Sequence, residues 1–282
     1  MAYAGALMRL RSLLFAPGNR PEYFPKLMTS GADGIVLDLE DAVPSGAKRD
    51  ARDVVRGALP SLVRDLGASR VFVRVNGART PWFQDDLGAL RGAGCGVVVP
   101  KLERLDELSA AGGWLAGVEV VAGIETVAAV EVAPVLCRAP VTAAYFGAED
   151  LMADLGGRRT AAGLEVLYAR TRVAFAARLG GVRAIDQVVI DFDDDVRFRR
   201  EADEARSLGY TGKLCIHPRQ VALANDAFTP STEEIEVNRR LVEAFEQAQR
   251  EGRGVMDFEG RMVDQPVYQR ALAVLRAAEQ GP

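Results

Sequence analysis

The sequence has 282 residues but only one histidine and three cysteines, which leaves few candidates for histidine-rich metal sites or disulfides. His217 cannot form a His-rich metal site, and it leaves a Ser-His-Asp mechanism with a single candidate base. Cys95, Cys137 and Cys215 are odd in number and form no CxxC pair. Each lies among apolar or small residues, which favours buried free thiols in a reducing compartment.

Long hydrophobic runs and long basic runs are also absent. No stretch reaches the roughly 18 uninterrupted apolar residues of a membrane span. Residues 1–15 are mostly small or apolar, but Arg9 and Arg11 interrupt them, and they lack a basic n-region and a clear cleavage site. The formal net charge is -4 and the Lys and Arg residues are scattered, which argues against a nucleic acid partner. We therefore expect a cytoplasmic protein that binds neither membranes nor nucleic acid.

What the sequence does contain is a series of short apolar runs. Each is rich in Val, Ile, Leu or Phe, as is typical of strands buried on both faces of a parallel sheet. The runs begin at Ser12, Gly34, Arg70, Gly96, Val118, Ala143, Asp186 and Gly212. Helix-compatible segments lie between them. This alternation predicts an α/β fold, a TIM (β/α)₈ barrel, with an open doubly wound sheet as the alternative.

Several residues suggest where the helices begin and end. Ser45 is a candidate N-cap, and Thr80 followed by proline is a favourable cap and first-turn pair. Gly180 and Gly209 suit the C-terminal ends of helices. Pro134 is expected to end or kink its helix.

The C-terminal segment is longer than a minimal barrel requires. After the eighth apolar run, a long helix with a cap at Ser231 is followed by a short hairpin turning at Glu259–Gly260 and a terminal helix. We predict a catalytic barrel over 1–228. The helix-hairpin-helix extension over 229–282 would pack on that barrel or on a neighbouring subunit.

Polar side chains follow the predicted strands. The run "GIVLDLEDAV" from Gly34 ends on Asp38, Glu40 and Asp41. The other strand ends carry Asn19 and Arg20, Arg74 and Asn76, Lys101 and Glu103, Glu125, Glu149 and Asp150, Asp191, and His217. A single aspartate at such a position is more often a cap or turn residue than a catalyst. Because a parallel barrel gathers its strand ends in one mouth, the whole set indicates a shared active site.

Two of these acidic residues are candidate metal ligands. Glu125 and Asp150 end adjacent predicted strands, so their carboxylates can converge. Two oxygen ligands with room for water and substrate suit Mg²⁺, and no Cys/His cluster competes for zinc. Glu149 is the neighbouring alternative, and either ligand could instead cap the following helix.

Arginine and lysine residues near the same strand ends are candidate anion-binding groups. The planar fork of Arg74 can hold a carboxylate in two parallel hydrogen bonds. A metal beside it would suit a 2-oxo or 2-hydroxy acid and would stabilise an enolate or alkoxide as a carbon–carbon bond forms or breaks. Arg20 and Lys26 could meet phosphate oxygens, or they could be ordinary surface charges.

The sequence resembles the citrate lyase β-subunit-like proteins of the HpcH/HpaI aldolase superfamily, which are related to malyl-CoA and citramalyl-CoA lyases. The similarity extends in order over nearly the whole chain. It is carried by "RSLLFAPGNRPEYFPKLMTSGADGIVLDLEDAVPSGAKRDAR", "VFVRVNGARTPWFQDDL", "VVVPKLE", "GIET", "FGAEDLMADLG", "GKLCIHPRQV", "FTPSTEEI" and "FEGRMVDQP".

The resemblance implies a Mg²⁺-dependent TIM barrel, usually a homotrimer, that acts on acyl-CoA thioesters and 2-oxo acids. It places the metal ligands at Glu125 and Asp150 and the substrate-binding arginine at Arg74. The acid/base residue, which in such relatives lies in a C-terminal segment over a neighbouring subunit's barrel, falls on Asp264. The family's residues that bind the phosphates of the nucleotide moiety correspond to Arg20 and Lys26.

These matches imply reversible cleavage of a carboxylated 3-hydroxyacyl-CoA to an acyl-CoA and a 2-oxo acid, with Asp38, Glu40 and Asp41 orienting Arg74 and Lys101. The chain departs from the family pattern at Ile190 before Asp191 and at Glu259 before Gly260, which leaves the acyl substrate open. Alternatives are a malyl-CoA-type thioesterase, a β subunit acting on an acyl carrier protein thioester within a citrate lyase complex, and a non-catalytic barrel.

Overall fold

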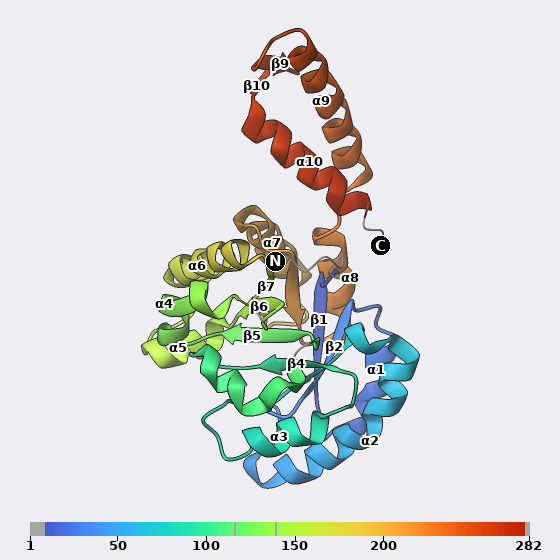
Figure 1. Cartoon of the computed structure of the whole chain (residues 1–282), viewed down its shortest axis with the longest axis vertical. Helices are drawn as coiled ribbons and strands as arrows, with labels where there is room; N and C mark the ends of the chain where they lie inside the picture. The colour runs from blue at the N-terminus through green and yellow to red at the C-terminus, as the bar shows by residue number, and fades with distance from the viewer. Residues whose placement is uncertain (1–8, 116, 139, 280–282) are drawn as a thin grey trace. The chain divides into compact units, whose positions relative to one another are not determined.

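The computed structural model describes residues 9–115, 117–138 and 140–279 (Figure 1). The chain divides into two compact units, Met1–Asp226 and Ala227–Pro282. They are named the barrel unit and the C-terminal unit below.

The barrel unit contains eight parallel strands. They are β1 (Ser12–Pro17), β2 (Gly34–Asp38), β3 (Val71–Arg74), β4 (Gly96–Val99), β5 (Val120–Ile124), β6 (Ala143–Phe146), β7 (Arg183–Asp186) and β8 (Gly212–Cys215). Each strand pairs with the next, and β8 pairs with β1, so the sheet closes on itself. The prediction of a TIM (β/α)₈ barrel is therefore confirmed.

Helices surround this sheet in the order expected of the fold (Figure 1). The α-helices are α1 (Phe24–Met28), α2 (Lys48–Leu66), α3 (Phe83–Leu90), α4 (Val127–Leu136), α5 (Ala148–Leu155), α6 (Leu164–Gly180), α7 (Asp195–Leu208) and α8 (Pro218–Ala227). Shorter 3₁₀ segments are η1 (Pro21–Tyr23), η2 (Ser45–Ala47), η3 (Ala68–Arg70) and η4 (Leu105–Leu115).

Apolar side chains from every strand fill the inside of the barrel. One buried cluster takes Leu13, Val36, Phe72, Val98, Val121, Ala143, Ile185 and Leu214 from β1 to β8 in turn, together with Leu10 and Tyr145. Because side chains alternate between the two faces of a strand, the residues two positions further along point to the same side. In β2 and β3 those residues are Asp38 and Arg74, so the interior becomes polar towards the carboxyl ends of the strands.

The helix boundaries agree only in part with the sequence predictions. Gly209 ends α7 in the left-handed conformation, as predicted. Gly180 is the last residue of α6, and the left-handed cap is the next residue, Gly181. A glycine is required at 180 because a Cβ there would lie 1.6 Å from the carbonyl oxygen of Cys137. Ser45 and Thr80 are not N-caps: Ser45 begins η2, while the Thr80 hydroxyl donates to the carbonyl oxygen of Gly77.

The predicted seventh strand was placed too late. The run starting at Asp186 was expected to form it, but β7 covers Arg183–Asp186 and ends where that run begins. The strand contains two charged residues, which disguises it in the sequence. Both are buried against partners from other elements, since Arg183 pairs with Glu119 and Asp186 pairs with Arg170.

The C-terminal unit has its own small core. Helix α9 (Thr232–Arg250) begins with the predicted cap at Ser231, which forms a capping box with Glu234. The hairpin of β9 (Met256–Phe258) and β10 (Arg261–Val263) turns at Glu259 and Gly260, both with positive φ. Helix α10 (Gln265–Glu279) follows. The buried residues of its core cluster are Leu241, Val242, Phe245, Ala248, Met256, Val263 and Ala271.

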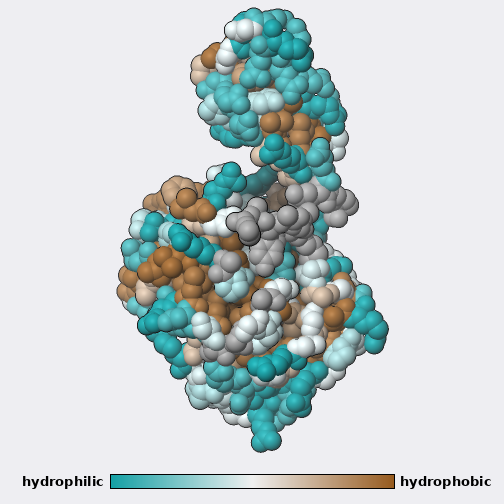
Figure 2. All heavy atoms as spheres, viewed as in Figure 1, coloured by the Kyte–Doolittle hydropathy of each residue, from teal (hydrophilic) through white to brown (hydrophobic). Residues whose placement is uncertain are grey.

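Helix α6 carries an exposed row of large apolar side chains at helical spacing. The row consists of Leu164, Tyr168, Phe175 and Leu179. Val127, Val132 and Val135 of the neighbouring α4 are also exposed. Figure 2 shows hydrophobic surface over the part of the barrel unit where Figure 1 places α4 to α6.

The remaining composition-based predictions concern the thiols and membranes. Cys95, Cys137 and Cys215 are buried and free, as predicted, and burial raises the pKa of Cys95 to about 11. Within the described ranges, every helix is too short or too polar to cross a membrane.

Candidate active site

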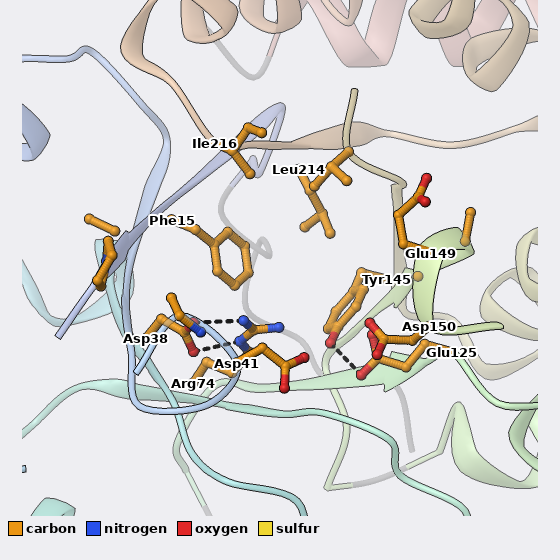
Figure 3. A pocket seen from close by; sticks show the side chains of 16 residues that line it. Phe15, Asp38, Asp41, Arg74, Glu125, Tyr145, Glu149, Asp150, Leu214 and Ile216 are labelled. Atoms are coloured by element: carbon orange, nitrogen blue, oxygen red, sulfur yellow. Dashed lines mark hydrogen bonds and ion pairs between the residues drawn. The ribbon is translucent and has the colours of Figure 1, made fainter. Parts of the chain in front are cut away.

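A pocket of about 370 Å³ opens among the carboxyl ends of the barrel strands (Figure 3). Its polar lining includes Asp38, Asp41, Arg74, Glu125 and Asp150. The loops that follow the parallel strands β2, β5 and β6 supply several of these side chains. This is the edge at which enzymes of this architecture hold their catalytic groups.

Arg74, the last residue of β3, is held by two carboxylates. Its Nε and Nη2 donate to the two oxygens of Asp38 at 2.6 and 2.7 Å, and Nη1 lies 2.9 Å from Glu40. Burial alone would lower the pKa of Arg74, but the charge and hydrogen bonds of Asp38 outweigh it and raise that pKa well above its usual value. The two-pronged bond predicted for a substrate carboxylate is therefore made to Asp38, so a substrate can use only the remaining N–H groups.

Lys101 links three acidic residues across the floor of the site. Its ammonium lies 2.7 Å from Glu40, 3.2 Å from Asp41 and 3.0 Å from Asp150. Burial would lower the pKa of Lys101, but Glu40, Glu125 and Asp150 raise it, so the side chain stays charged. Its backbone has a positive φ of 48°, and its N–H donates to Oε1 of Glu125 at 2.8 Å.

Glu125 follows β5 directly and is almost fully buried. Besides the Lys101 N–H, its Oε1 accepts a 2.8 Å hydrogen bond from the hydroxyl of Tyr145. Burial, followed by the charges of Asp150 and Glu40, raises the pKa of Glu125 to about 7. Gly147 leaves room for this carboxylate, since a Cβ there would lie 2.4 Å from its Oε2.

Asp150 lies in the first turn of α5, beyond the end of β6 where the sequence placed it. Its carboxylate and that of Glu125 line the same pocket (Figure 3). Lys101 contacts both, through its ammonium to Asp150 and its backbone N–H to Glu125. The alternative ligand, Glu149, lies 3.2 Å from Nε of Arg159. Glu125 and Asp150 therefore converge, with Arg74 lining the same pocket.

This pair of carboxylates fits a magnesium ion. Among the residues that the structure describes, no three His, Cys, Asp or Glu side chains are grouped to hold a metal. Mg²⁺ needs no such cage, because it keeps several waters and commonly takes one or two protein carboxylates together with oxygens of the substrate. Burial is the main cause of the raised pKa of Glu125, and the negative charges of Asp150 and Glu40, which a cation would offset, add to it.

The two candidate phosphate-binding residues lie outside this pocket. Arg20 is paired with Glu22 at 2.5 Å and stacks over the ring of Tyr23. Lys26 is exposed on α1. Both follow the carboxyl end of β1, but neither side chain lines the pocket.

Asp264 belongs to the C-terminal unit, where it caps a helix. Its Oδ1 accepts a hydrogen bond of 3.3 Å from the N–H of Val267, and its carbonyl oxygen accepts one from the N–H of Tyr268. This local role explains an aspartate directly before α10 without reference to catalysis. Its assignment as an acid/base residue stays a prediction.

Several of the predicted strand-end residues do not line the pocket, and one residue that does line it, Tyr145, is not among the predicted ones. Asp191 pairs with Arg197, and His217 stacks on Phe192, so neither contributes. The end of β8 instead supplies the apolar Leu214 and Ile216. The hydroxyl of Tyr145 donates a hydrogen bond to Glu125. The sequence gives a single indication of this role, a polar hydroxyl within the otherwise apolar run "AAYF".

Comparison with known proteins gives consistent matches. Residues 11–218 match the HpcH/HpaI aldolase/citrate lyase family. The chain is 48% identical to a citrate lyase subunit beta-like protein of Deinococcus radiodurans, with 94% of this chain and 96% of that protein covered. It is 34% identical to a (3S)-malyl-CoA thioesterase of Cereibacter sphaeroides, with 95% of this chain and 94% of that protein covered.

Solved structures of similar proteins agree with these sequence matches. The protein CitE of Mycobacterium tuberculosis, crystallised in complex with magnesium, acetoacetate and coenzyme A, superposes with a TM-score of 0.83 and 34% sequence identity. The match covers 97% of this chain and all of that one.

Proposed function

Because the chain belongs to the HpcH/HpaI aldolase/citrate lyase family, we propose that it is a Mg²⁺-dependent carbon–carbon lyase. Its substrate would be a 3-hydroxyacyl-CoA with a carboxylate on C3, of the citryl-, malyl- or citramalyl-CoA type. The products would be an acyl-CoA and a 2-oxo acid. The observation that carries the proposal is the convergence of Glu125, Asp150 and Arg74 on one pocket at the carboxyl ends of the strands.

Glu125 and Asp150 would hold the magnesium ion. When bound, Mg²⁺ supplies a Lewis acid that stabilises negative charge on substrate oxygens. The CitE structure contains magnesium together with acetoacetate and coenzyme A, which supports both the metal and the substrate class.

The side chains around the metal position the substrate. Arg74 neutralises the substrate carboxylate through N–H groups that Asp38 and Glu40 do not use, while those two acids fix its orientation. Lys101 stays charged and keeps Glu40 and Asp150 in place. Arg20 and Lys26 would bind phosphate groups of coenzyme A near the end of β1, where both are exposed to solvent.

The reaction itself needs no oxidant or reductant. In cleavage the C2–C3 bond breaks, its electron pair passes to the thioester enolate, and the C3 hydroxyl loses its proton to become the carbonyl of the 2-oxo acid. C2 then takes a proton and gives the acyl-CoA. We assign this proton transfer to Asp264, with a contribution of about 10²–10⁴-fold, as for other general acids.

We also propose that the chain acts in the cytoplasm as a homotrimer. The exposed apolar row on α6 supports contact with a second copy of this chain. Residues 229–282 would then place Asp264 over the barrel of a neighbouring subunit.

The experiment is direct. The protein is incubated with malyl-, citramalyl- and citryl-CoA, with Mg²⁺ or with EDTA, and products are identified by mass spectrometry. We expect acyl-CoA and 2-oxo acid only with Mg²⁺, and no turnover by Glu125→Gln or Asp150→Asn. Full turnover by either folded variant in EDTA would refute the proposed metal site.

The same assay separates a thioesterase from a lyase. The similarity to a (3S)-malyl-CoA thioesterase favours hydrolysis as the second candidate function. Hydrolysis releases free coenzyme A and an intact hydroxy acid, whereas cleavage releases a 2-oxo acid and leaves the thioester whole.

A third candidate follows from the similarity to a citrate lyase subunit beta-like protein. As a β subunit of a citrate lyase complex, the chain would act on an acyl carrier protein thioester. Turnover of such a thioester by a protein that is inactive on the CoA thioesters would favour this function.

A further inference from the structure

A buried lysine that the proposed reaction does not use lies beside the loop that follows β2. Lys48 is the first residue of α2, and only 6% of it is exposed. Its ammonium donates hydrogen bonds of 2.7 Å to the carbonyl oxygens of Leu39 and Glu40. It also lies 5.3 Å from the centre of the ring of Trp82, which directly precedes α3. Two backbone acceptors and an aromatic ring therefore take the place of water around this ammonium.

The two carbonyl groups belong to residues that adjoin Arg74. The N–H of Leu39 donates to the carbonyl oxygen of Arg74 at 2.9 Å, and the N–H of Glu40 donates to the carboxylate of Asp38 at 2.9 Å. With the two hydrogen bonds from Lys48, both the N–H and the C=O groups of Leu39 and Glu40 have partners. Because the peptide groups on both sides of Glu40 are held, the direction of its Cα–Cβ bond is fixed as well.

The direction of Glu40 determines what its carboxylate contacts. Its two oxygens lie 2.9 Å from Nη1 of Arg74 and 2.7 Å from the ammonium of Lys101, so the carboxylate bridges these two cations. Arg74 lines the candidate active-site pocket (Figure 3). A shift of the Glu40 backbone would therefore move the guanidinium whose remaining N–H groups are assigned to the substrate carboxylate.

We propose that Lys48 is a positioning residue of the lyase reaction. Its ammonium holds the loop at Leu39 and Glu40, and through the Glu40 carboxylate it sets the place of the Arg74 guanidinium in the pocket. This inference rests on the proposed lyase function and adds to it a residue that does not itself line the pocket.

Lys48→Met tests the inference, because it keeps most of the side chain and removes the ammonium. Misplacement of a substrate-holding group by about 1 Å can cost about 100-fold in rate. The kcat for the thioester that the wild-type protein cleaves should therefore fall about 100-fold.

Arg70→Met is the matched control. Arg70 donates a 2.8 Å hydrogen bond to the carbonyl oxygen of Ala32, so this variant also removes a cation from a backbone carbonyl group. Arg70 directly precedes β3, whereas Arg74 ends that strand, so the control lies at the opposite end of the strand. Its kcat should equal that of the wild-type protein.

A double-mutant cycle separates positioning from a general effect on the fold. If Lys48 acts through Glu40, Lys48→Met should lower kcat about 100-fold in the wild-type background but less than about threefold in a Glu40→Gln background. A lysine that only stabilises the fold would lower kcat by the same factor in both backgrounds.

Lys48→Arg carries the test if Lys48→Met does not fold. It keeps the positive charge, but its planar guanidinium is longer and cannot place both donors where the ammonium has them. Its kcat should fall about tenfold in the wild-type background, and again by less than about threefold beside Glu40→Gln.

The outcomes separate this inference from the proposed function. Equal changes of kcat in the two backgrounds, including no change in either, would overturn the positioning role of Lys48 while the lyase function stands. A wild-type protein that releases no 2-oxo acid from malyl-, citramalyl- or citryl-CoA would overturn the lyase function and the inference with it.

Discussion

Tyr145 shows how one buried hydroxyl can tune a candidate metal ligand. It donates a 2.8 Å hydrogen bond to Glu125 from a position inside the barrel. Burial and the charge of Glu125 raise the pKa of Tyr145 well above its usual value, so the hydroxyl keeps its proton. It therefore acts as a permanent donor that orients the carboxylate and stabilises its charged form.

Removing that hydroxyl should weaken magnesium binding without unfolding the protein. We expect Tyr145→Phe to raise the Mg²⁺ dissociation constant about 10- to 100-fold, the usual effect of losing a partner of a metal ligand. Isothermal titration calorimetry measures it. Tyr168→Phe is the matched control, since that exposed hydroxyl lies 3.4 Å from Glu131 on the outside of the barrel. Unchanged affinity in folded Tyr145→Phe would exclude the orienting role.

Glu125 makes magnesium binding sensitive to pH. Its pKa of about 7 applies to the metal-free protein, so the carboxyl is largely protonated below pH 7 and charged above it. A metal must displace that proton, so the Mg²⁺ dissociation constant should rise about tenfold for each pH unit below 7 and level off above it. Titrations in buffers of different ionisation enthalpy should detect about one released proton at pH 6. A dissociation constant that stays flat from pH 6 to 8 would contradict this.

At the scale of elements, a buried group of charges connects two strands with two helices. Asp186 of β7 lies 2.6 Å from the ammonium of Lys213 of β8. Arg170 of α6 donates to both oxygens of Asp186, and it also donates to the carbonyl oxygen of Glu201 in α7. These charges pair with each other out of contact with solvent, so removal of one leaves others unpaired.

Asp186→Asn should therefore destabilise the barrel unit strongly. Lys213 and Arg170 would lose their shared carboxylate, and we expect the free energy of unfolding to fall by about 3–5 kcal/mol. Guanidinium titration followed by circular dichroism measures it. Asp193→Asn removes an exposed partner of Arg219 and should change stability by less than about 1 kcal/mol. Equal stability of the two variants would rule out a stabilising role for this group.

The same element shows what limits prediction from sequence. Most strands are uninterrupted apolar runs, and their pattern identifies them because both faces are buried. In β7, Arg183 and Asp186 break the pattern, and the partners that make their burial possible, Glu119 and Arg170, lie far along the chain. The periodicity of apolar residues cannot detect such pairing. The sequence therefore predicts a seventh strand that begins too far along the chain, and it wrongly predicts Asp191 among the residues at the open end of the barrel.

The order of elements determines which of the predicted site residues lie close together. Residues after parallel strands meet at one edge, so Glu125, Asp150 and Arg74 could be assigned to the same pocket. The partners of these side chains depend on the register between neighbouring strands. Asp38 lies beside Arg74 because β2 and β3 pair those two residues. No local sequence pattern shows that the Asp38 carboxylate would accept hydrogen bonds from the guanidinium of Arg74.

At the scale of the whole molecule, the exposed row on α6 should determine the oligomeric state. Large apolar side chains in one row are costly to leave in water, and contact with a second copy of the chain would cover them. We expect Phe175→Glu to convert the proposed homotrimer to monomers, as measured by light scattering. Val196→Glu places the same charge at an exposed apolar position on α7 and should leave the trimer intact. A trimeric Phe175→Glu protein would exclude this surface.

The proposed trimer would also determine which subunit completes each active site. If Asp264 serves the barrel of a neighbouring subunit, an Asp264→Asn chain and an Arg74→Lys chain are each inactive alone but complement each other. In a random mixture, a site is complete when its barrel comes from the first chain and its neighbour is the second. About a quarter of the sites should then be active.

The mixture is made by co-expressing two differently tagged chains and isolating all oligomers, with their composition checked by native mass spectrometry. Recovery of about a quarter of the wild-type kcat supports an active site shared between subunits. Inactive mixed trimers would show that Asp264 serves its own barrel. Full activity of Asp264→Asn alone would show that its place before α10, where it accepts from the N–H of Val267, is its only role.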